Sequence, residues 1–246
     1  MFKKILSSLL LFVAMFSCIG YAAGTAKDQW QWYFSDTHRS GYFNPASVTY
    51  DKKSNTAMVW EKYVMLNGSV QQNYLKIDFS NKTDQLIRYV NPTGNEILSP
   101  KSNPKHEIGP GTPTETLANA VADQLNIPHL YKGGSDRWQW FHSTDTESYY
   151  IAADATSYNP KTNLYYAWIR IQRSANNSDY PGHYVFDFKN HRWGFATSNQ
   201  LKPVKPDSWE EIIYNGVYDF CKKHYGIPDK KDQIDNFGFL STQQTE

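Results

Sequence analysis

The residues with the most reactive side chains are Cys221 and His224, three positions apart near the end of the chain. An imidazole beside a thiol is typical of cysteine nucleophiles, and Lys222 and Lys223 add positive charge that lowers the pKa of a thiol. Against this, Cys221 follows Phe220 on the apolar side of a predicted helix, where a free cysteine behaves as a small hydrophobic residue. We therefore expect no enzyme activity, and an envelope enzyme using this cysteine and histidine is only the second alternative.

The other residues that could bind a metal or a cofactor form no recognised pattern. The seven histidines include no HExxH pair, and the aspartates lack the alternating oxygen ligands and central glycine of a calcium loop. The sequence has no GxSxG elbow, no P-loop and no dinucleotide fingerprint. We expect no metal site and no cofactor.

Aromatic residues are the main candidates for ligand contact, since 18 Tyr, 13 Phe and 8 Trp make up 16% of the 246 residues. Exposed Trp and Tyr side chains on a sheet stack on sugar rings or form hot spots for protein partners. Six tryptophans recur at matched places in an internal repeat, which favours a role in the core; they are Trp30, Trp32, Trp60, Trp138, Trp140 and Trp168. The residues that we expect to contact a ligand are Trp193, Tyr165, Tyr166, Tyr149 and Tyr150.

The beginning of the chain reads as an export signal. Lys3 and Lys4 precede an apolar run over residues 5–16, and small residues follow around Ala22, which is the order of a secretory signal peptide and predicts one over residues 1–23. The run is shorter than the roughly 20 residues that span a bilayer, so we expect an exported protein of the cell envelope, periplasm or extracellular space with no transmembrane segment. The 25 basic and 24 acidic residues nearly balance, which indicates no nucleic-acid partner.

Cys18 lies at the end of this signal and has a second interpretation. Ser17 before it suits a bacterial lipoprotein box, whereas Met15 and Phe16 fit that box poorly. Lipid attachment at Cys18 would anchor the protein to a membrane. Ordinary signal cleavage would instead remove Cys18 and leave Cys221 without a disulfide partner.

The chain repeats itself. The segment DQWQWY at 28–33 returns as DRWQWF at 136–141, and the same offset aligns Tyr42 with Tyr150 and Trp60 with Trp168. Each repeat has about 100 residues, the size of a domain rather than of a solenoid repeat. The sequence predicts a signal peptide at 1–23, a first domain at 28–128, a linker at 129–135, a second domain at 136–228 and a tail at 229–246.

Both repeats have the same pattern of predicted elements. Apolar and polar residues alternate in several runs, and the turn-rich segments 51–55 and 159–163 are typical of hairpin connections. A capping box at Thr112–Glu115 and the segment 206–211 each begin a predicted helix. The second helix has an apolar stripe of Trp209, Ile213, Val217 and Phe220. We predict an α+β fold with two tandem domains, each a small antiparallel β-sheet meander with a C-terminal amphipathic helix.

These features resemble the surface-adhesin protein E-like domain of bacterial envelopes, present twice over residues 28–127 and 136–227. The resemblance rests on the Trp-rich opening strand, the segment at 44–48, the strand ending near Trp60 and the closing helix introduced by Pro and Ser or Thr. It implies a small sheet with a C-terminal helix, an exported or lipid-anchored location and, in adhesive members, binding to host extracellular proteins. The family's helix-to-strand disulfide is absent, since Cys221 has no partner.

We therefore predict a non-enzymatic, adhesin-like binding protein of the envelope or exterior, whose partner is an extracellular protein. The alternative is a cell-wall carbohydrate-binding module that contacts glycan through clustered exposed Trp and Tyr. A structural role through pairing of edge strands between copies also remains open.

Overall fold

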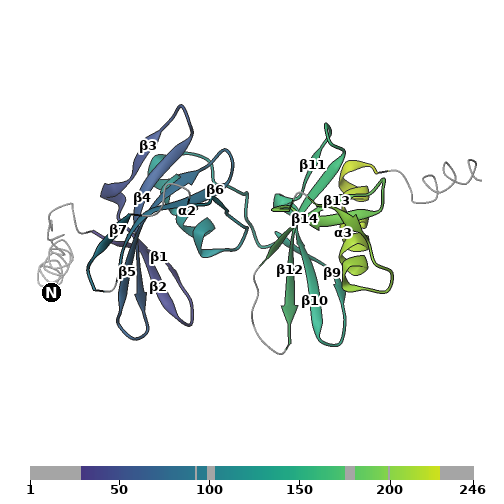
Figure 1. Cartoon of the computed structure of the whole chain (residues 1–246), viewed down its shortest axis with the longest axis horizontal. Helices are drawn as coiled ribbons and strands as arrows, with labels where there is room; N and C mark the ends of the chain where they lie inside the picture. Colours follow the sequence, from purple (N-terminus) through teal and green to yellow (C-terminus); the bar gives the residue numbers. More distant parts are fainter. Residues whose placement is uncertain (1–28, 92, 99–102, 175–180, 199, 228–246) are drawn as a thin grey trace, which may run out of the picture.

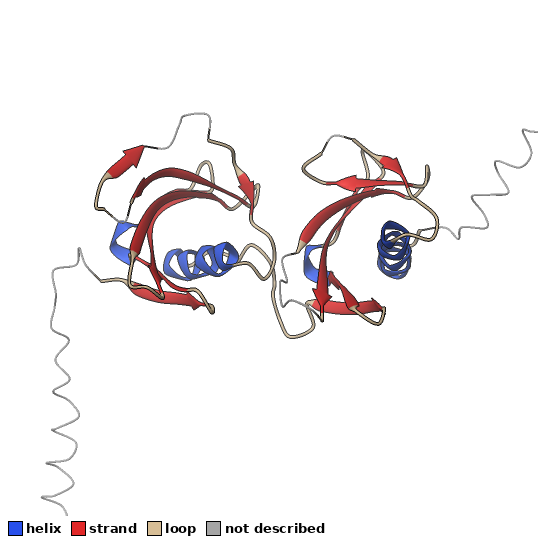
Figure 2. Cartoon of the chain, turned by 60° about the horizontal axis from the view of Figure 1, so that its bottom comes forward, coloured by secondary structure: helices blue, strands red, loops and turns tan. Residues whose placement is uncertain are grey.

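The computed structural model describes residues 29–91, 93–98, 103–174, 181–198 and 200–227. The predicted signal peptide, Cys18 and the predicted tail lie outside the described residues. The chain forms two antiparallel sheets that lie side by side (Figure 1), each with one α-helix on its concave face (Figure 2). We call residues 29–127 the first unit and residues 136–227 the second unit.

The first unit contains an eight-stranded sheet in the order β1-β2-β4-β5-β6-β7, with β3 paired to β4 and β8 to β6. Helix α2 (Pro113–Leu125) follows the last strand. The strands are β1 (Gln31–Ser35), β2 (Arg39–Phe43), β3 (Thr49–Asp51), β4 (Thr56–Met65), β5 (Val70–Asp78), β6 (Thr83–Val90), β7 (Glu96–Leu98) and β8 (His106–Glu107).

The second unit contains a seven-stranded sheet in the order β15-β14-β13-β12-β10-β9, with β11 paired to β12. Helix α3 (Trp209–Tyr225) follows. The strands are β9 (Trp138–Ser143), β10 (Glu147–Ala152), β11 (Ser157–Asn159), β12 (Leu164–Arg173), β13 (Gly182–Asp187), β14 (Arg192–Phe195) and β15 (Lys202–Pro203).

The predicted α+β class is wrong, because the fold is mostly β. The described residues form fifteen strands in two antiparallel sheets and only two α-helices, so neither sheet is small. The sequence pattern contains no sign of β7, β8 and β15, which have only two or three residues each. A strand of that length is fixed by pairing to its neighbour, and it is too short to show a period-two pattern in the sequence.

Local turn and cap signals in the sequence were correct. The predicted turns join β3 to β4 and β11 to β12, and the equivalent Asn55 and Asn163 take positive φ values of 52° and 56°, which asparagine tolerates. Thr112 accepts a hydrogen bond from the Glu115 amide at the start of α2, and Pro113 is the first helical residue. These features can be predicted from the sequence because each depends on residues that are only a few positions apart.

Each sheet has its own apolar core against its helix. In the first unit Val59 and Ile77 pack with Leu117 and Val121 of α2. In the second unit the predicted stripe of α3 is shifted, since Trp209 is 42% exposed and Phe220 is only partly buried. The buried residues of α3 are Ile213, Tyr214, Val217, Tyr218 and Cys221.

The first core also contains a buried carboxylate that the second core lacks. Glu61 on β4 is 2% exposed, and it accepts hydrogen bonds from the Tyr33 hydroxyl and from Nδ2 of Asn73 at 2.9 Å. Burial and the Glu61 charge raise the pKa of Tyr33. In the repeat alignment the counterparts of Tyr33 and Glu61 are Phe141 and Ile169, so the second core is apolar at these two positions.

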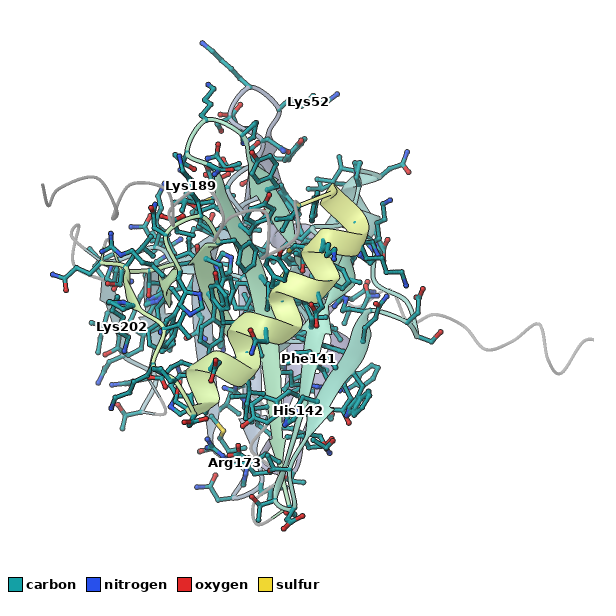
Figure 3. The ribbon with its side chains drawn as sticks, turned by 90° about the vertical axis from the view of Figure 1, so that its right-hand side faces the viewer. Lys52, Phe141, His142, Arg173, Lys189 and Lys202 are labelled. Carbon is teal, nitrogen blue, oxygen red and sulfur yellow. The ribbon has the colours of Figure 1, made fainter. Side chains whose placement is uncertain are left out.

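Helix α3 approaches β9 at a glycine. A Cβ placed on Gly216 would lie 2.1 Å from Cδ2 of Phe141, a side chain beside α3 in Figure 3. The counterpart of Gly216 in the first unit is Ala120. The second unit therefore requires glycine where the first unit has a methyl group.

We predict that Gly216→Ala destabilises the protein although alanine favours helices, because the added methyl group has no room beside Phe141. Overpacking of this kind costs about 1–3 kcal/mol. Thermal unfolding followed by circular dichroism should show a lower midpoint for this variant. Lys223→Ala on the exposed side of the same helix is the control, and an unchanged midpoint for Gly216→Ala would contradict the packing argument.

Candidate functional site

Three of the five residues predicted to contact a ligand are buried in the second core. Trp193 and Tyr149 are each 1% exposed and Tyr165 is 7% exposed. The Trp193 ring packs against Trp209, with ring centroids 5.2 Å apart. These three side chains hold the second core together and are covered from solvent.

The other two predicted residues, Tyr150 and Tyr166, are half-buried and lie on the sheet face away from α3. Alternation along β12 explains this placement, because Tyr165, Ala167 and Ile169 belong to the core and side chains between them point the other way. We call this side the second outer face. It carries Trp138, Tyr150, Tyr166, Trp168, Arg170 and His183.

The predicted core role is wrong for five of the six repeated tryptophans. Trp30, Trp60 and Trp138 are only half-buried and belong to neither apolar core. Trp32 is 58% exposed and Trp140 is 61% exposed. In both units the indole Nε1 donates a hydrogen bond to a serine three residues later, at 2.9 Å to Ser35 and 2.8 Å to Ser143. Trp32 pairs with Tyr42 and Trp140 pairs with Tyr150, so both indoles lie on the side of the sheet away from the helix. Recurrence at matched places, on which the prediction depended, does not indicate which side a residue occupies.

The outer faces of the two sheets carry the same cation–aromatic clamp. In the first unit Nζ of Lys62 lies 4.6 Å from the Trp30 ring centroid and 5.2 Å from that of Tyr42. In the second unit Cζ of Arg170 lies 4.8 Å from the ring centroids of both Trp138 and Tyr150. These residues are equivalent in the repeat. A cation over an aromatic face is attracted by the ring quadrupole, so each clamp fixes its rings in place.

A second aromatic pair lies beside each clamp. Trp60 pairs across strands with Tyr74, and Cζ of Arg88 lies 5.1 Å and 4.7 Å from their ring centroids. At the matching place Trp168 pairs with His183, and these two rings stack with centroids 4.5 Å apart and planes 3° apart. We call the first of these surfaces the first outer face; it carries Trp30, Tyr42, Trp60, Lys62, Tyr74 and Arg88.

The two outer faces differ in what covers them. Residues 108–112 of the first unit, which we call the covering turn, lie against the second outer face. A Cβ on Gly109 would lie 2.8 Å from Cζ3 of Trp168, and one on Gly111 would lie 3.6 Å from Trp138. Trp168 is therefore only 8% exposed, whereas its counterpart Trp60 is half-buried. Figure 2 shows the same arrangement, with α2 between the two sheets and α3 on the far side of the second sheet.

A buried ion pair holds the covering turn in place. Arg137 donates two hydrogen bonds to the Glu115 carboxylate at 2.7 and 2.8 Å, and a third to Asp154 at 3.1 Å. The Glu115 carboxylate also accepts the Gly111 amide at 2.6 Å. Arg137 and Glu115 are 9% and 3% exposed. Glu115 belongs to α2 and Asp154 to the second unit, so this arginine joins the two units.

A cleft of about 230 Å³ lies at the edge of this contact. Nδ1 of His183 is 2.8 Å from Glu107 of the first unit, and that hydrogen bond lowers the pKa of the Glu107 carboxyl. Lys82 lies over the Tyr131 ring at 4.0 Å, and burial lowers the pKa of Lys82. Every charged group that we have named in the cleft has a partner, so the cleft serves the contact between units.

A larger open groove of about 490 Å³ lies between β9 and α3. Figure 3 shows Phe141 and His142 at this place. The groove is lined by Phe141, His142, Trp209 and Ile212 together with acidic residues Asp207, Glu211 and Asp219. The counterpart of Glu211 in the first unit is Glu115, the residue that binds Arg137.

The structure does not bring Cys221 and His224 together as a catalytic pair. Cys221 is fully buried in the second core, and burial raises the pKa of its thiol to about 12. His224 is exposed, and its Nδ1 contacts the Phe220 carbonyl at 2.8 Å. The buried sulfur is an argument against the alternative of an enzyme that uses these two residues.

The described residues contain no group of three or more His, Cys, Asp or Glu side chains placed to hold a metal ion. In the same part of the chain, no helix has the length and apolarity to cross a membrane.

The sequence reasoning missed the covering turn and its arginine. Gly109 and Gly111 read as loop glycines, and Glu115 already had a local role in a capping box. A usable signal was present in the repeat alignment, where Lys205 and Asp207 replace Gly109 and Gly111. A glycine found in only one of two copies indicates a close approach in that copy alone.

We predict that Cys221 does not react with a thiol reagent such as dithionitrobenzoate at pH 8 while the protein is folded. The thiolate is the reactive form, and both burial and the raised pKa suppress it. Absorbance should show one reactive thiol in the described part of the chain only after denaturant is added. Rapid modification of the folded protein would contradict the buried position.

Comparison of the chain with protein-family models, curated proteins and solved structures finds no match. The resemblance to the surface-adhesin protein E-like domain stays a prediction from the sequence pattern.

Proposed function

We propose that this chain is an exported, non-enzymatic, adhesin-like binding protein, and that the first outer face contacts its partner. Export is inferred from the signal-like residues 1–23, which lie outside the described residues. Binding is supported by a difference in burial between two equivalent surfaces. On the second outer face a turn of the same chain leaves Trp168 only 8% exposed, whereas its counterpart Trp60 on the first is half-buried.

The covered face suggests which class of partner suits the open one. The second outer face contacts a turn of the same chain, whose glycines allow the backbone to approach Trp168 and Trp138. Aromatic and arginine side chains are also the residues most enriched at the centre of protein interfaces. We therefore propose a protein partner that presents a turn to Trp60 and Trp30.

Rigidity supports the same proposal. The cations Lys62 and Arg88 lie over the aromatic rings of the first outer face, which restrains the rings before a partner arrives. A surface that is ordered in advance loses less conformational entropy on binding. This is the property expected of a binding face rather than of a core edge.

A second candidate is a cell-wall glycan, and the exposure of Trp32 and Trp140 favours it. Each indole is fixed by a hydrogen bond to serine and leaves more than half of its surface open. A fixed, exposed indole is a platform on which a sugar ring can stack. The two candidates use different tryptophans, so they can be separated by mutation.

For the protein partner, we predict that a synthetic peptide with the sequence of residues 106–114, which contains the covering turn but not Glu115, binds the first outer face of the intact chain. In NMR spectra the indole NH signals of Trp30 and Trp60 should shift as peptide is added, while the signal of Trp168, already covered, should not. A peptide with lysine at the position of Gly109 is the matched control and should shift them far less. Unchanged Trp30 and Trp60 signals at saturating peptide would refute the polypeptide proposal.

For the glycan candidate, we predict that a soluble N-acetylglucosamine oligomer changes the tryptophan fluorescence and that Trp32→Ala with Trp140→Ala abolishes the change. Trp60→Ala should leave it intact, because Trp60 is half-buried and is not one of the two exposed indoles. Circular dichroism checks that each variant is folded. A response that survives loss of both exposed tryptophans would exclude them as the sugar platform.

A further inference from the structure

The covering turn has a counterpart in the second unit. Residues 204–208, which we call the distal turn, follow β15 as residues 108–112 follow β8. The Ile108 amide donates to the Lys82 carbonyl at 2.8 Å, and the Val204 amide donates to the His191 carbonyl at 3.1 Å. Both turns therefore leave their sheets at the same place.

The two turns also have the same internal geometry. Gly111 and Asp207 have positive φ values of 77° and 53°. The Glu115 carboxylate accepts the Gly111 amide at 2.6 Å, and the Glu211 carboxylate accepts the Asp207 amide at 2.8 Å. Thr112 and Ser208 then cap the helices that follow.

Each side of the contact between the two units therefore has a second copy elsewhere in the chain. The first outer face is the counterpart of the covered face, and the distal turn is the counterpart of the covering turn. Both helices lie on the same side of their sheets (Figure 2). A face at one end and a matching turn at the other would join copies in a heterologous contact, which forms open chains rather than closed dimers.

Three residues at these two places differ from their counterparts in the contact between the units. Lys205 replaces Gly109, at a position where even a Cβ would lie 2.8 Å from the tryptophan ring. Gln29 replaces Arg137 and removes the cation that would bind Glu211. Ala46 replaces Asp154, the second carboxylate around that arginine.

We propose that the two ends of this chain are complementary in backbone shape and that Lys205 and Gln29 prevent head-to-tail association with a second copy. Lys205 fills the space that the turn needs against Trp60. Gln29 leaves the Glu211 carboxylate without the bidentate cation that Glu115 has, and loss of one partner of a buried ion pair is strongly unfavourable. This inference rests on the internal contact and does not require a ligand on the first outer face.

The test introduces the residues of the internal contact at both positions of the full chain, as Lys205→Gly with Gln29→Arg. Sedimentation velocity should show a monomer for the original chain at all concentrations. The double variant should at least double its average mass as concentration rises, without a plateau at the dimer. Adding Trp60→Ala to the double variant should return it to the monomer.

The matched control is Lys202→Gly with Gln29→Arg, which removes a neighbouring lysine and leaves the distal turn blocked; it should stay monomeric. A folded double variant that remains monomeric would overturn the proposal, as would association of the original chain. Oligomers that persist with Trp60→Ala would also overturn it, because they would not use the first outer face. Circular dichroism establishes folding for every variant.

Discussion

The arrangement of the two units depends on the guanidinium of Arg137. It binds Glu115 at the start of α2 and Asp154 beside the second sheet, and all three side chains are almost fully buried. A buried ion pair contributes little net stability, because desolvation offsets most of the attraction, but an unpaired buried charge is costly. The pair therefore selects one arrangement of the units, and the glycine turn, the covered Trp168 and the Glu107–His183 contact all follow from it.

The two outer faces show how one surface can have two uses after duplication. Both sheets retain the clamp of a cation between Trp and Tyr rings, although nothing in the core requires it. In the second unit this surface is used within the chain, where it receives the turn at Gly109. In the first unit the same surface is partly exposed, which is why we assign the proposed binding role to it. The surface has been retained, and only what lies against it differs.

The sequence predicted what is decided within a few residues. The duplication, the Asn55 and Asn163 turns and the Thr112 cap were readable because spacing and turn chemistry determine them. Which tryptophans are buried could not be predicted, since recurrence in the repeat does not indicate which side of the sheet a residue occupies, and Trp32 lies on the outer side with Tyr42. The second outer face was found only in part, through Tyr150 and Tyr166. Its partner was missed, because contacts between units leave no periodic signal.

The buried Glu61 gives the two cores different tolerance to sequence change. In the first unit a substitution at Glu61, Tyr33 or Asn73 leaves the remaining members with unmet hydrogen bonds, so these positions can change only together. In the second unit Phe141 and Ile169 occupy two of the same places, and one apolar residue can replace another of similar volume. Over many generations the second core is free to drift one residue at a time, while the first is confined to coordinated replacements.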